Sequence, residues 1–242
     1  MTLNQALKDR LVAGMRARAG ASIYGVQVNR RLGGALAQVA FGLGLRPNQV
    51  TVASGLTSAL AVATLALVRP TVLTGVLVWL LVVLAYALDA ADGMLARMRG
   101  GGTLAGEWFD HVLDAGRVVA LHSGVLVMTY RFYESRASSL LPLLYVLVAA
   151  VLYAAGTLAE ILLRGHRTDE PSGPSAPVIT LRGLLLMPLD LGVLALSFLF
   201  IASESAFPAV YGTFLALTSV VGAALLVKWF RQLTAVSAKA TT

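Results

Sequence analysis

The sequence from Asp89 to Asp114 reads DAADGMLARMRGGGTLAGEWFDHVLD and holds four aspartates in a chain that is otherwise strongly apolar. If the segments on either side of the glycines at 100–102 are helices, Asp89 and Asp92 share one face of the first helix. Asp110 and Asp114 share one face of the second. The short glycine turn would then bring the two acidic faces together. Facing carboxylates repel one another unless cations neutralise them, and hard oxygen ligands suit Mg²⁺ or Mn²⁺. The stretch therefore predicts a metal site.

The composition around this stretch is that of a membrane protein. The chain has 242 residues, of which 57% are hydrophobic and 13% are charged, and its mean hydropathy is +0.78. One domain is the natural expectation for this length. The absence of cysteine excludes disulfides and thiolate metal sites. Because of the apolar segments, the net charge of +7 indicates contact with an anionic membrane surface, and no nucleic-acid partner is expected.

The apolar segments predict an all-α integral membrane protein with six transmembrane helices, preceded by an N-terminal amphipathic juxtamembrane helix. An uncharged segment of about 18–20 residues is long enough to cross the bilayer core. The predicted spans are 51–68, 70–88, about 103–130, 137–159, a segment after Arg182 that Asp190 interrupts, and 206–227. An intramembrane carboxylate is costly, so we expect Asp190 to pair with Arg117 or Arg182, or to serve as a buried hydrogen-bonding group.

The N-terminal region is expected to lie on the membrane surface. Between Ile23 and Leu45 apolar residues recur at spacings of three and four, which is typical of an interfacial helix, although Gly33 and Gly34 weaken the helix prediction. Residues 1–20 carry charges throughout and have no apolar core, so no secretory signal peptide is expected. We divide the chain into an interfacial segment (1–46), a six-helix membrane domain (47–232) and a cytoplasmic tail (233–242).

The basic residues predict the orientation. Six spans place both termini on one side, and assigning that side to the cytoplasm gathers fifteen of the nineteen Lys and Arg residues there. The acidic stretch then faces the cytoplasm, with the plasma membrane of a prokaryote as the expected location. The cytoplasmic set is Lys8, Arg10, Arg16, Arg18, Arg30, Arg31, Arg46, Arg97, Arg99, Arg164, Arg167, Arg182, Lys228, Arg231 and Lys239.

The spacing within the acidic stretch resembles that of a known enzyme family. The pattern D-x2-D-G-x2-A-R-x8-G-x3-D-x3-D is met at every fixed position and is similar to the motif of the CDP-alcohol phosphotransferase (CDP-alcohol phosphatidyltransferase) family. The resemblance implies transfer of a substituted phosphate from a CDP-linked donor to a hydroxyl acceptor, with release of CMP, and a homodimer among membrane lipids. The eight matching residues are Asp89, Asp92, Gly93, Ala96, Arg97, Gly106, Asp110 and Asp114.

The resemblance also implies roles for individual residues. Two Mg²⁺ or Mn²⁺ ions would be held by Asp89, Asp92 and Asp110, with Asp114 contributing or standing nearby, and Asp114 would be the general base. The nucleotide would be held by Gly93, Ala96, Arg97, Gly106 and, at the start of the first span, Asn48. Asn48 is equally open to interpretation as a helix cap next to Pro47.

Two sets of residues give different clues to the acceptor. Glu107 and His111 make the second half of the motif similar to that of the choline and ethanolamine phosphotransferases, whose acceptor is a diacylglycerol, and His111 could relay a proton. The arginines at 117, 164 and 182 could instead bind a phosphorylated acceptor, or simply anchor the topology. The candidate acceptor residues are Glu107, Arg117, Arg164 and Arg182.

Three alternatives stand beside this prediction. Intramembrane prenyltransferases also use aspartate-rich motifs on a Mg²⁺-bound diphosphate, but their two motifs lie far apart in the chain. A cation transporter would carry polar residues through several spans, whereas only Asp190 lies deep here. A catalytically silent scaffold would lack motif residues, and none is missing. Metal-dependent release of CMP distinguishes the enzyme from the transporter and the scaffold.

Overall fold

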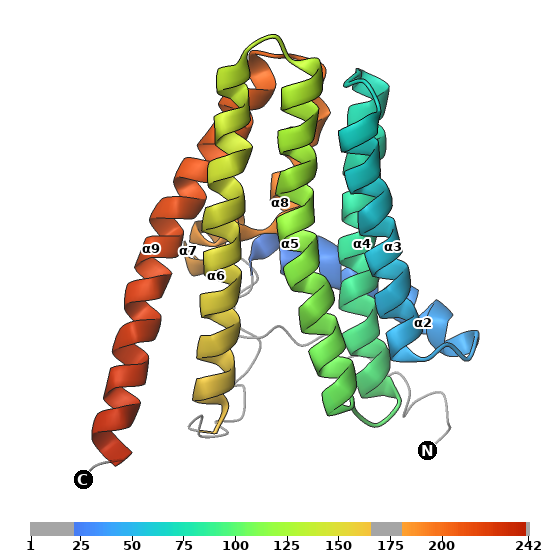
Figure 1. The fold of residues 1–242 in the computed structure, drawn as a ribbon. Helices are drawn as coiled ribbons and strands as arrows, with labels where there is room; N and C mark the ends of the chain where they lie inside the picture. Colours follow the sequence, from blue (N-terminus) through green and yellow to red (C-terminus); the bar gives the residue numbers. More distant parts are fainter. Residues whose placement is uncertain (1–21, 166–180, 241–242) are drawn as a thin grey trace.

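The computed structural model describes residues 22–165 and 181–240, and every regular element in these ranges is a helix (Figure 1). Five long helices stand side by side and make up most of the bundle. Shorter helices precede and interrupt them. The long helices are α3 (Pro47–Leu67), α4 (Val72–Met98), α5 (Leu104–Phe132), α6 (Leu140–Arg164) and α9 (Ala206–Ala240).

These five helices are long and apolar enough to cross a membrane, if α6 is counted with the preceding 3-10 helix η2 (Arg136–Ser139). The finding confirms an all-helical, multi-pass membrane protein. The predicted spans 51–68, 70–88, 137–159 and 206–227 coincide, to within three residues at their ends, with parts of α3, α4, α6 and α9, and the predicted third span coincides with α5.

The predicted fifth span is not one continuous helix. It is divided into α7 (Leu181–Leu185), η3 (Met187–Leu189), α8 (Leu191–Ala195) and η4 (Leu196–Phe200). Pro188 cannot donate a backbone hydrogen bond, and Asp190 adopts an extended conformation and caps α8 by accepting from the Gly192 backbone N–H. The apolar stretch Leu191–Phe200 would rise about 15 Å, half of a bilayer core. Five helices are therefore long enough to span a membrane, and helix length alone does not confirm the sixth predicted span.

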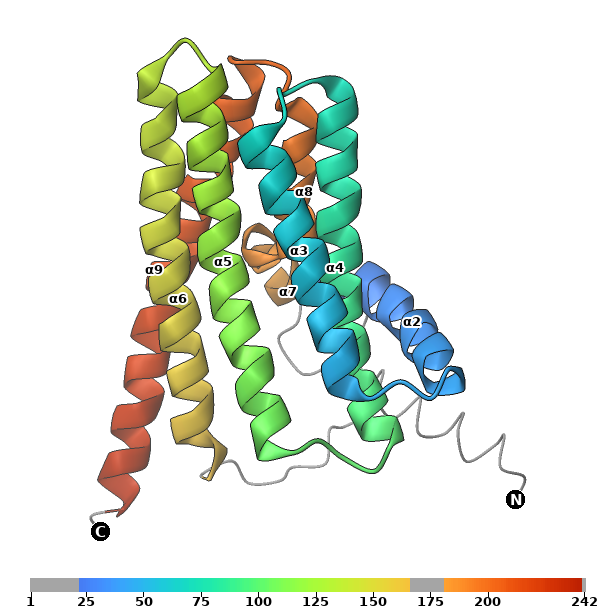
Figure 2. The ribbon, with the colours of Figure 1, turned by 45° about the vertical axis from the view of Figure 1, so that its right-hand side comes forward.

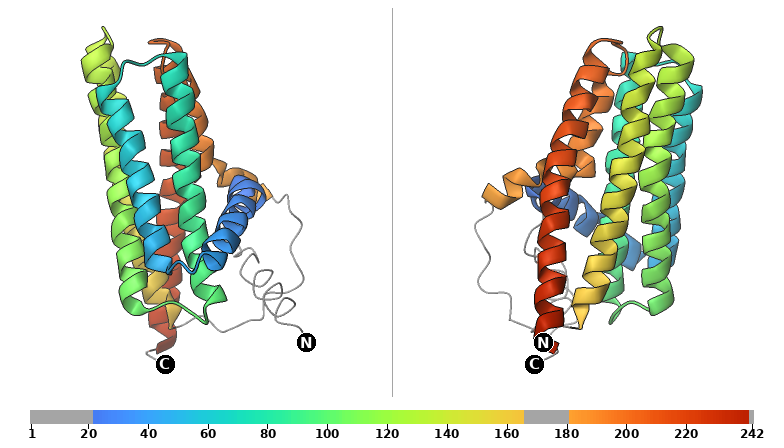
Figure 3. Two further views of the ribbon diagram at one scale, coloured as in Figure 1. Left: turned by 90° about the vertical axis from the view of Figure 1, so that its right-hand side faces the viewer. Right: turned by 60° about the vertical axis from the view of Figure 1, so that its left-hand side comes forward.

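Where the sequence predicted an amphipathic juxtamembrane helix, the structure has a single turn of π-helix, η1 (Gly25–Asn29), followed by α2 (Arg30–Gly42). The helix α2 packs obliquely against the outside of α4 (Figures 2 and 3). Gly33 lies inside α2, and a Cβ there would come within 2.8 Å of the Ala90 side chain, so the glycine permits the close approach that its helix propensity alone would not suggest. Residues 1–21, with Lys8, Arg10, Arg16 and Arg18, lie outside the described residues, as does Arg167.

Two clusters of buried apolar side chains hold the bundle together. The larger one joins α3, α4, α5, α6, α9 and the α8–η4 segment, and the smaller one packs α2 against α3 and the last turns of α4. Within the larger cluster, α4 and η4 come so close that a Cβ on Gly75 would meet the Phe198 backbone oxygen at 2.5 Å. The short helices are therefore fixed against α4, the helix that carries Asp89 and Asp92.

The turn between α4 and α5 depends on glycine. Gly100 and Gly101 have φ values of +100° and +127°, which residues with a Cβ rarely adopt. The turn reverses the chain at one end of the bundle, and α5 returns beside α3, which packs on both α4 and α5 (Figures 1 and 2). This reversal sets the two halves of the acidic motif opposite each other.

Candidate metal centre

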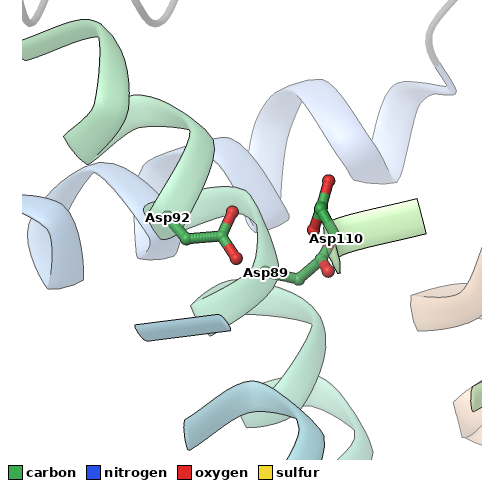
Figure 4. Close-up of side chains that lie close together, drawn as sticks. All are labelled: Asp89, Asp92 and Asp110. Carbon is green, nitrogen blue, oxygen red and sulfur yellow. The ribbon is translucent and has the colours of Figure 1, made fainter. Parts of the chain in front are cut away.

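Three carboxylates converge where α4 faces α5. Asp89 and Asp92 come from neighbouring turns of α4, and Asp110 approaches from α5 (Figure 4). Each offers an oxygen that lies within 4.8 Å of the oxygens offered by the other two. The predicted helical faces therefore do meet, and the structure brings together three of the four expected metal ligands.

The chemistry of these carboxylates fits a divalent cation. Asp92 is only 5% exposed, and two buried oxygens in the cluster, Asp92 Oδ2 and Asp110 Oδ1, have no hydrogen-bond partner among the described residues. A buried carboxylate oxygen without a donor is costly, and neighbouring carboxylates repel one another. Mg²⁺ and Mn²⁺ prefer carboxylate oxygens and would satisfy both requirements.

The fourth aspartate is joined to this cluster by an arginine. Arg117 Nη1 lies 3.0 Å from Asp114 Oδ1, and Arg117 Nη2 lies 2.9 Å from Asp89 Oδ1. The same Nη2 donates to Ser54 Oγ at 2.8 Å, and Ser54 donates in turn to the Ala85 carbonyl oxygen at 2.8 Å. Asp114 is thus held beside the three-carboxylate cluster, and the Arg117 guanidinium is already bound to two carboxylates.

The residues expected to hold the nucleotide gather at the motif's end of α3, α4 and α5. A Cβ on Gly106 would lie 3.1 Å from Asn48 Oδ1, and one on Gly93 would lie 3.6 Å from Arg97 Nη1. Asn48 therefore stands directly against the start of α5, beside Gly106. Ala96 belongs to the same turn of α4 as Arg97.

Two of the four expected acceptor residues, Glu107 and Arg164, meet between α5 and α6, away from Arg117. Glu107 Oε1 lies 2.6 Å from Arg164 Nη2 and 4.0 Å from His111 Nε2. Tyr153 on α6 donates a hydrogen bond to the His111 backbone oxygen at 2.8 Å. Arg182 lies on α7, exposed, and no ion pair joins it to another side chain in the described ranges. The structure brings Glu107, His111 and Arg164 together but does not bring Arg182 to them.

Asp190 pairs with neither arginine. Its carboxylate accepts hydrogen bonds from the Ser22 hydroxyl and the Gly192 backbone N–H. Asp190 is therefore a buried hydrogen-bonding group, which was the other role expected for it. Ser22, Ser54 and Tyr153 are contributors that the sequence analysis missed. Ser54 and Tyr153 lie on helices outside the motif and Ser22 precedes the first helix, and isolated serines and tyrosines carry no spacing signal.

Comparison with known proteins agrees with this arrangement. A family model described as CDP-alcohol phosphatidyltransferase matches residues 45–241. Comparison with curated proteins gives no significant match.

Two solved structures of phosphatidylinositol phosphate synthase from Mycobacterium tuberculosis have a similar fold. One, with CDP-DAG bound, is 22% identical, with a TM-score of 0.52 over 84% of this chain and 94% of that one. The other, in complex with manganese and citrate, is 20% identical, with a TM-score of 0.54 over 82% and 87% of the two chains.

The family model spans most of the chain and includes the whole acidic motif, and it decides against the prenyltransferase and transporter alternatives. The chain therefore belongs to the CDP-alcohol phosphatidyltransferase family and is a membrane phosphotransferase that uses a CDP-linked donor in phospholipid biosynthesis.

Proposed function

We propose that the chain moves a substituted phosphate from its CDP-linked donor to a hydroxyl acceptor at the carboxylate cluster of α4 and α5, with release of CMP. The observation that carries the proposal is the convergence of Asp89, Asp92 and Asp110 within 4.8 Å, with two buried oxygens that lack donors. Such a cluster is costly unless a cation completes it, and a diphosphate substrate requires a cation.

Asp89, Asp92 and Asp110 would hold the divalent cations, with Asp114 beside them. Bound Mg²⁺ or Mn²⁺, two ions in our proposal, would neutralise the diphosphate and stabilise the charge that develops on the leaving group. The solved structure with manganese, on a similar fold, is in keeping with this choice of metal.

The side chains around the cluster would position the two substrates. Asn48, Gly93, Ala96, Arg97 and Gly106 would hold the CDP group, since the two glycines let the ligand approach the backbone and a guanidinium suits phosphate oxygens.

Asp114 would take the proton of the acceptor hydroxyl while the new phosphorus–oxygen bond forms and the bond to CMP breaks. Arg117 would fix the orientation of the Asp114 carboxylate through the 3.0 Å contact. Glu107, His111 and Arg164 would lie on the acceptor side, and His111 would relay the proton.

We further propose that the α7–α8–η4 segment completes a sixth passage, so that both termini and the metal centre lie on the cytoplasmic side. The distribution of Lys and Arg supports this orientation.

Leu32, Val39 and Leu43 are exposed on and just after α2, as expected for a helix at the head-group boundary. Only 6% of the apolar stretch within residues 136–164 is buried, which leaves α6 open to lipid or to a second copy of the chain in a homodimer.

The test is release of CMP by the purified protein in lipid micelles. CDP-diacylglycerol, CDP-choline, CDP-ethanolamine and CDP-glycerol would each be offered with Mg²⁺ or Mn²⁺ against a panel of alcohols. We expect turnover on at least one pair that stops with EDTA and is lost in Asp114→Asn. Binding of cytidine nucleotides without turnover on any pair would show that the acceptor is absent from the panel. Absence of both binding and turnover would refute the proposal.

A further inference from the structure

A cavity of about 280 Å³ lies inside the bundle, next to the metal centre. Its walls come from α5, α6, η3, α8 and α9, and Arg117, which holds Asp89 and Asp114, is one of the lining residues. The volume is at the lower end of the range of small-molecule sites, about 300–1,000 Å³. It therefore suits part of a substrate rather than a whole lipid.

The walls of the cavity are mostly aliphatic, and the hydroxyl groups of Tyr145, Tyr153 and Thr218 are already bonded to the protein. The Tyr145 hydroxyl lies 2.9 Å from Thr218 Oγ1, which donates to the Pro188 backbone oxygen at 3.0 Å. Nδ1 of His122 lies 2.5 Å from the Tyr211 hydroxyl. A ligand rich in hydroxyl groups would find few partners here and would lose its bonds to water on entering.

The two charged residues of the lining are also occupied. The Arg117 guanidinium contacts the carboxylates of Asp89 and Asp114, which neutralise its charge, and its Nε is buried. Asp190 accepts from Ser22 and Gly192. Among the described lining residues there is accordingly no cation left to bind a phosphate, whereas a hydrocarbon would gain the full benefit of leaving water.

The position of the cavity distinguishes the two substrates. The proposed nucleotide residues belong to α3, α4 and the first turn of α5, and none of them lines the cavity. Arg117 stands between the cavity and Asp114, the proposed base, and Tyr153 joins the cavity to His111. The cavity is thus on the side from which the acceptor hydroxyl would approach.

We propose that this cavity holds the hydrocarbon part of a lipophilic alcohol, such as a diacylglycerol, which is the hydroxyl acceptor of the reaction. The inference rests on the proposed function, because it names the class of acceptor for the same site. It excludes a phosphorylated polyol as the occupant of the cavity. The alcohol's hydroxyl would point past Arg117 towards Asp114.

The first test is binding, which does not depend on turnover. A diacylglycerol that carries a photoreactive diazirine in one acyl chain would be cross-linked to the purified protein in micelles, and the modified residues would be mapped by mass spectrometry. We expect labelling of cavity residues such as Leu121 or Leu152, protection by 1,2-dioctanoylglycerol and no protection by sn-glycerol 3-phosphate. Labelling confined to outward-facing residues such as Leu147, or protection by glycerol phosphate, would overturn the proposal.

A matched pair of substitutions on α6 tests the position. Ala149 lines the cavity and Ala154 is exposed on the outside. In Ala149→Phe the new ring would displace methylene groups of the ligand, each worth about fourfold in affinity, so cavity labelling should fall about tenfold or more. Ala154→Phe should leave it unchanged, and Ala149→Val, a smaller change, should give an intermediate loss. Equal labelling of all four proteins would contradict the proposal.

Kinetics separates this inference from the proposed function. With a lipophilic acceptor, Ala149→Phe should raise the KM for the alcohol about tenfold and leave the KM for the CDP-linked donor unchanged. If the protein released CMP only with phosphorylated polyols, the phosphotransferase would stand and the lipophilic acceptor would be refuted. If no pair released CMP, the proposed function would fail, and the photolabelling would still decide what the cavity binds.

Discussion

Replacing Arg117 by methionine removes the guanidinium that contacts both Asp89 and Asp114, and it keeps much of the side chain's apolar length. Arg117 is 8% exposed at its side chain and contacts Asp89 at 2.9 Å and Asp114 at 3.0 Å. Removing one partner of a buried ion pair costs about 3–5 kcal/mol, because the remaining charge is left uncompensated. Asp89 and Asp114 keep 20% and 26% exposure, so we expect the lower end of this range.

A loss of about 3 kcal/mol should lower the Tm of a chain of this size by about 6–12 °C. The measurement is thermal unfolding in micelles, followed by tryptophan fluorescence, in EDTA and in Mn²⁺. We expect the deficit of Arg117→Met to be larger in EDTA, since a bound cation stabilises the folded state and partly replaces the missing charge. Arg69→Met, at an exposed position at the opposite end of the bundle, should unfold with the wild type.

The double variant Arg117→Met/Asp114→Asn gives the sharper criterion. If the guanidinium neutralises the cluster, removing one negative charge should recover part of the lost stability, and the two substitutions should be non-additive by about 1–3 kcal/mol. Additive losses, or an Arg117→Met protein that unfolds at the wild-type temperature in EDTA, would refute the electrostatic role assigned to Arg117.

Three further substitutions test other parts of the structure. Gly75→Ala would press a methyl group against the η4 backbone at 2.5 Å and should destabilise the protein by about 1–3 kcal/mol in thermal unfolding. Gly116→Ala, with open space around the new methyl group, should not destabilise it. Equal Tm values for the two variants would contradict the α4–η4 packing. Glu107→Gln breaks an exposed ion pair with Arg164, so it should leave the Tm unchanged and raise the KM for the acceptor. A marked drop in Tm would be inconsistent with the exposed position of the pair. Asp190→Ala removes the acceptor of the Ser22 hydroxyl and should speed cleavage at residues 22–24 in limited proteolysis, and a cleavage rate equal to the wild type would count against this anchoring role.

The acidic motif shows what periodicity can predict. Asp89, Asp92 and Asp110 meet because helical spacing fixes which residues share a face and because Gly100 and Gly101 permit the reversal. Both are local properties of the chain. The long spans were predictable for the same reason, since an apolar run of sufficient length has few alternatives in a bilayer.

Contacts between distant helices could not be predicted in this way. Ser54 reaches Arg117 across 63 positions of sequence, and Tyr153 reaches His111 across 42, through helix packing that leaves no spacing signal. The predicted fifth span is not one continuous helix, because hydropathy does not register that Pro188 and Asp190 end and restart a helix. Helix propensity alone counts Gly33 against a helix, whereas its close packing against Ala90 favours glycine at this position.

The central claim is that the carboxylates of α4 and α5 form a divalent metal centre, and binding of Mn²⁺ tests it most directly. Free Mn²⁺ would be titrated by electron paramagnetic resonance in the presence of purified wild-type protein, Asp92→Asn and, as a control, Glu134→Gln at an exposed site beyond the end of α5. We predict that the wild type and Glu134→Gln bind two ions per chain, as a two-metal phosphotransferase requires, and that Asp92→Asn loses at least one of them. Equal binding by all three proteins, or no binding by the wild type, would contradict the metal centre.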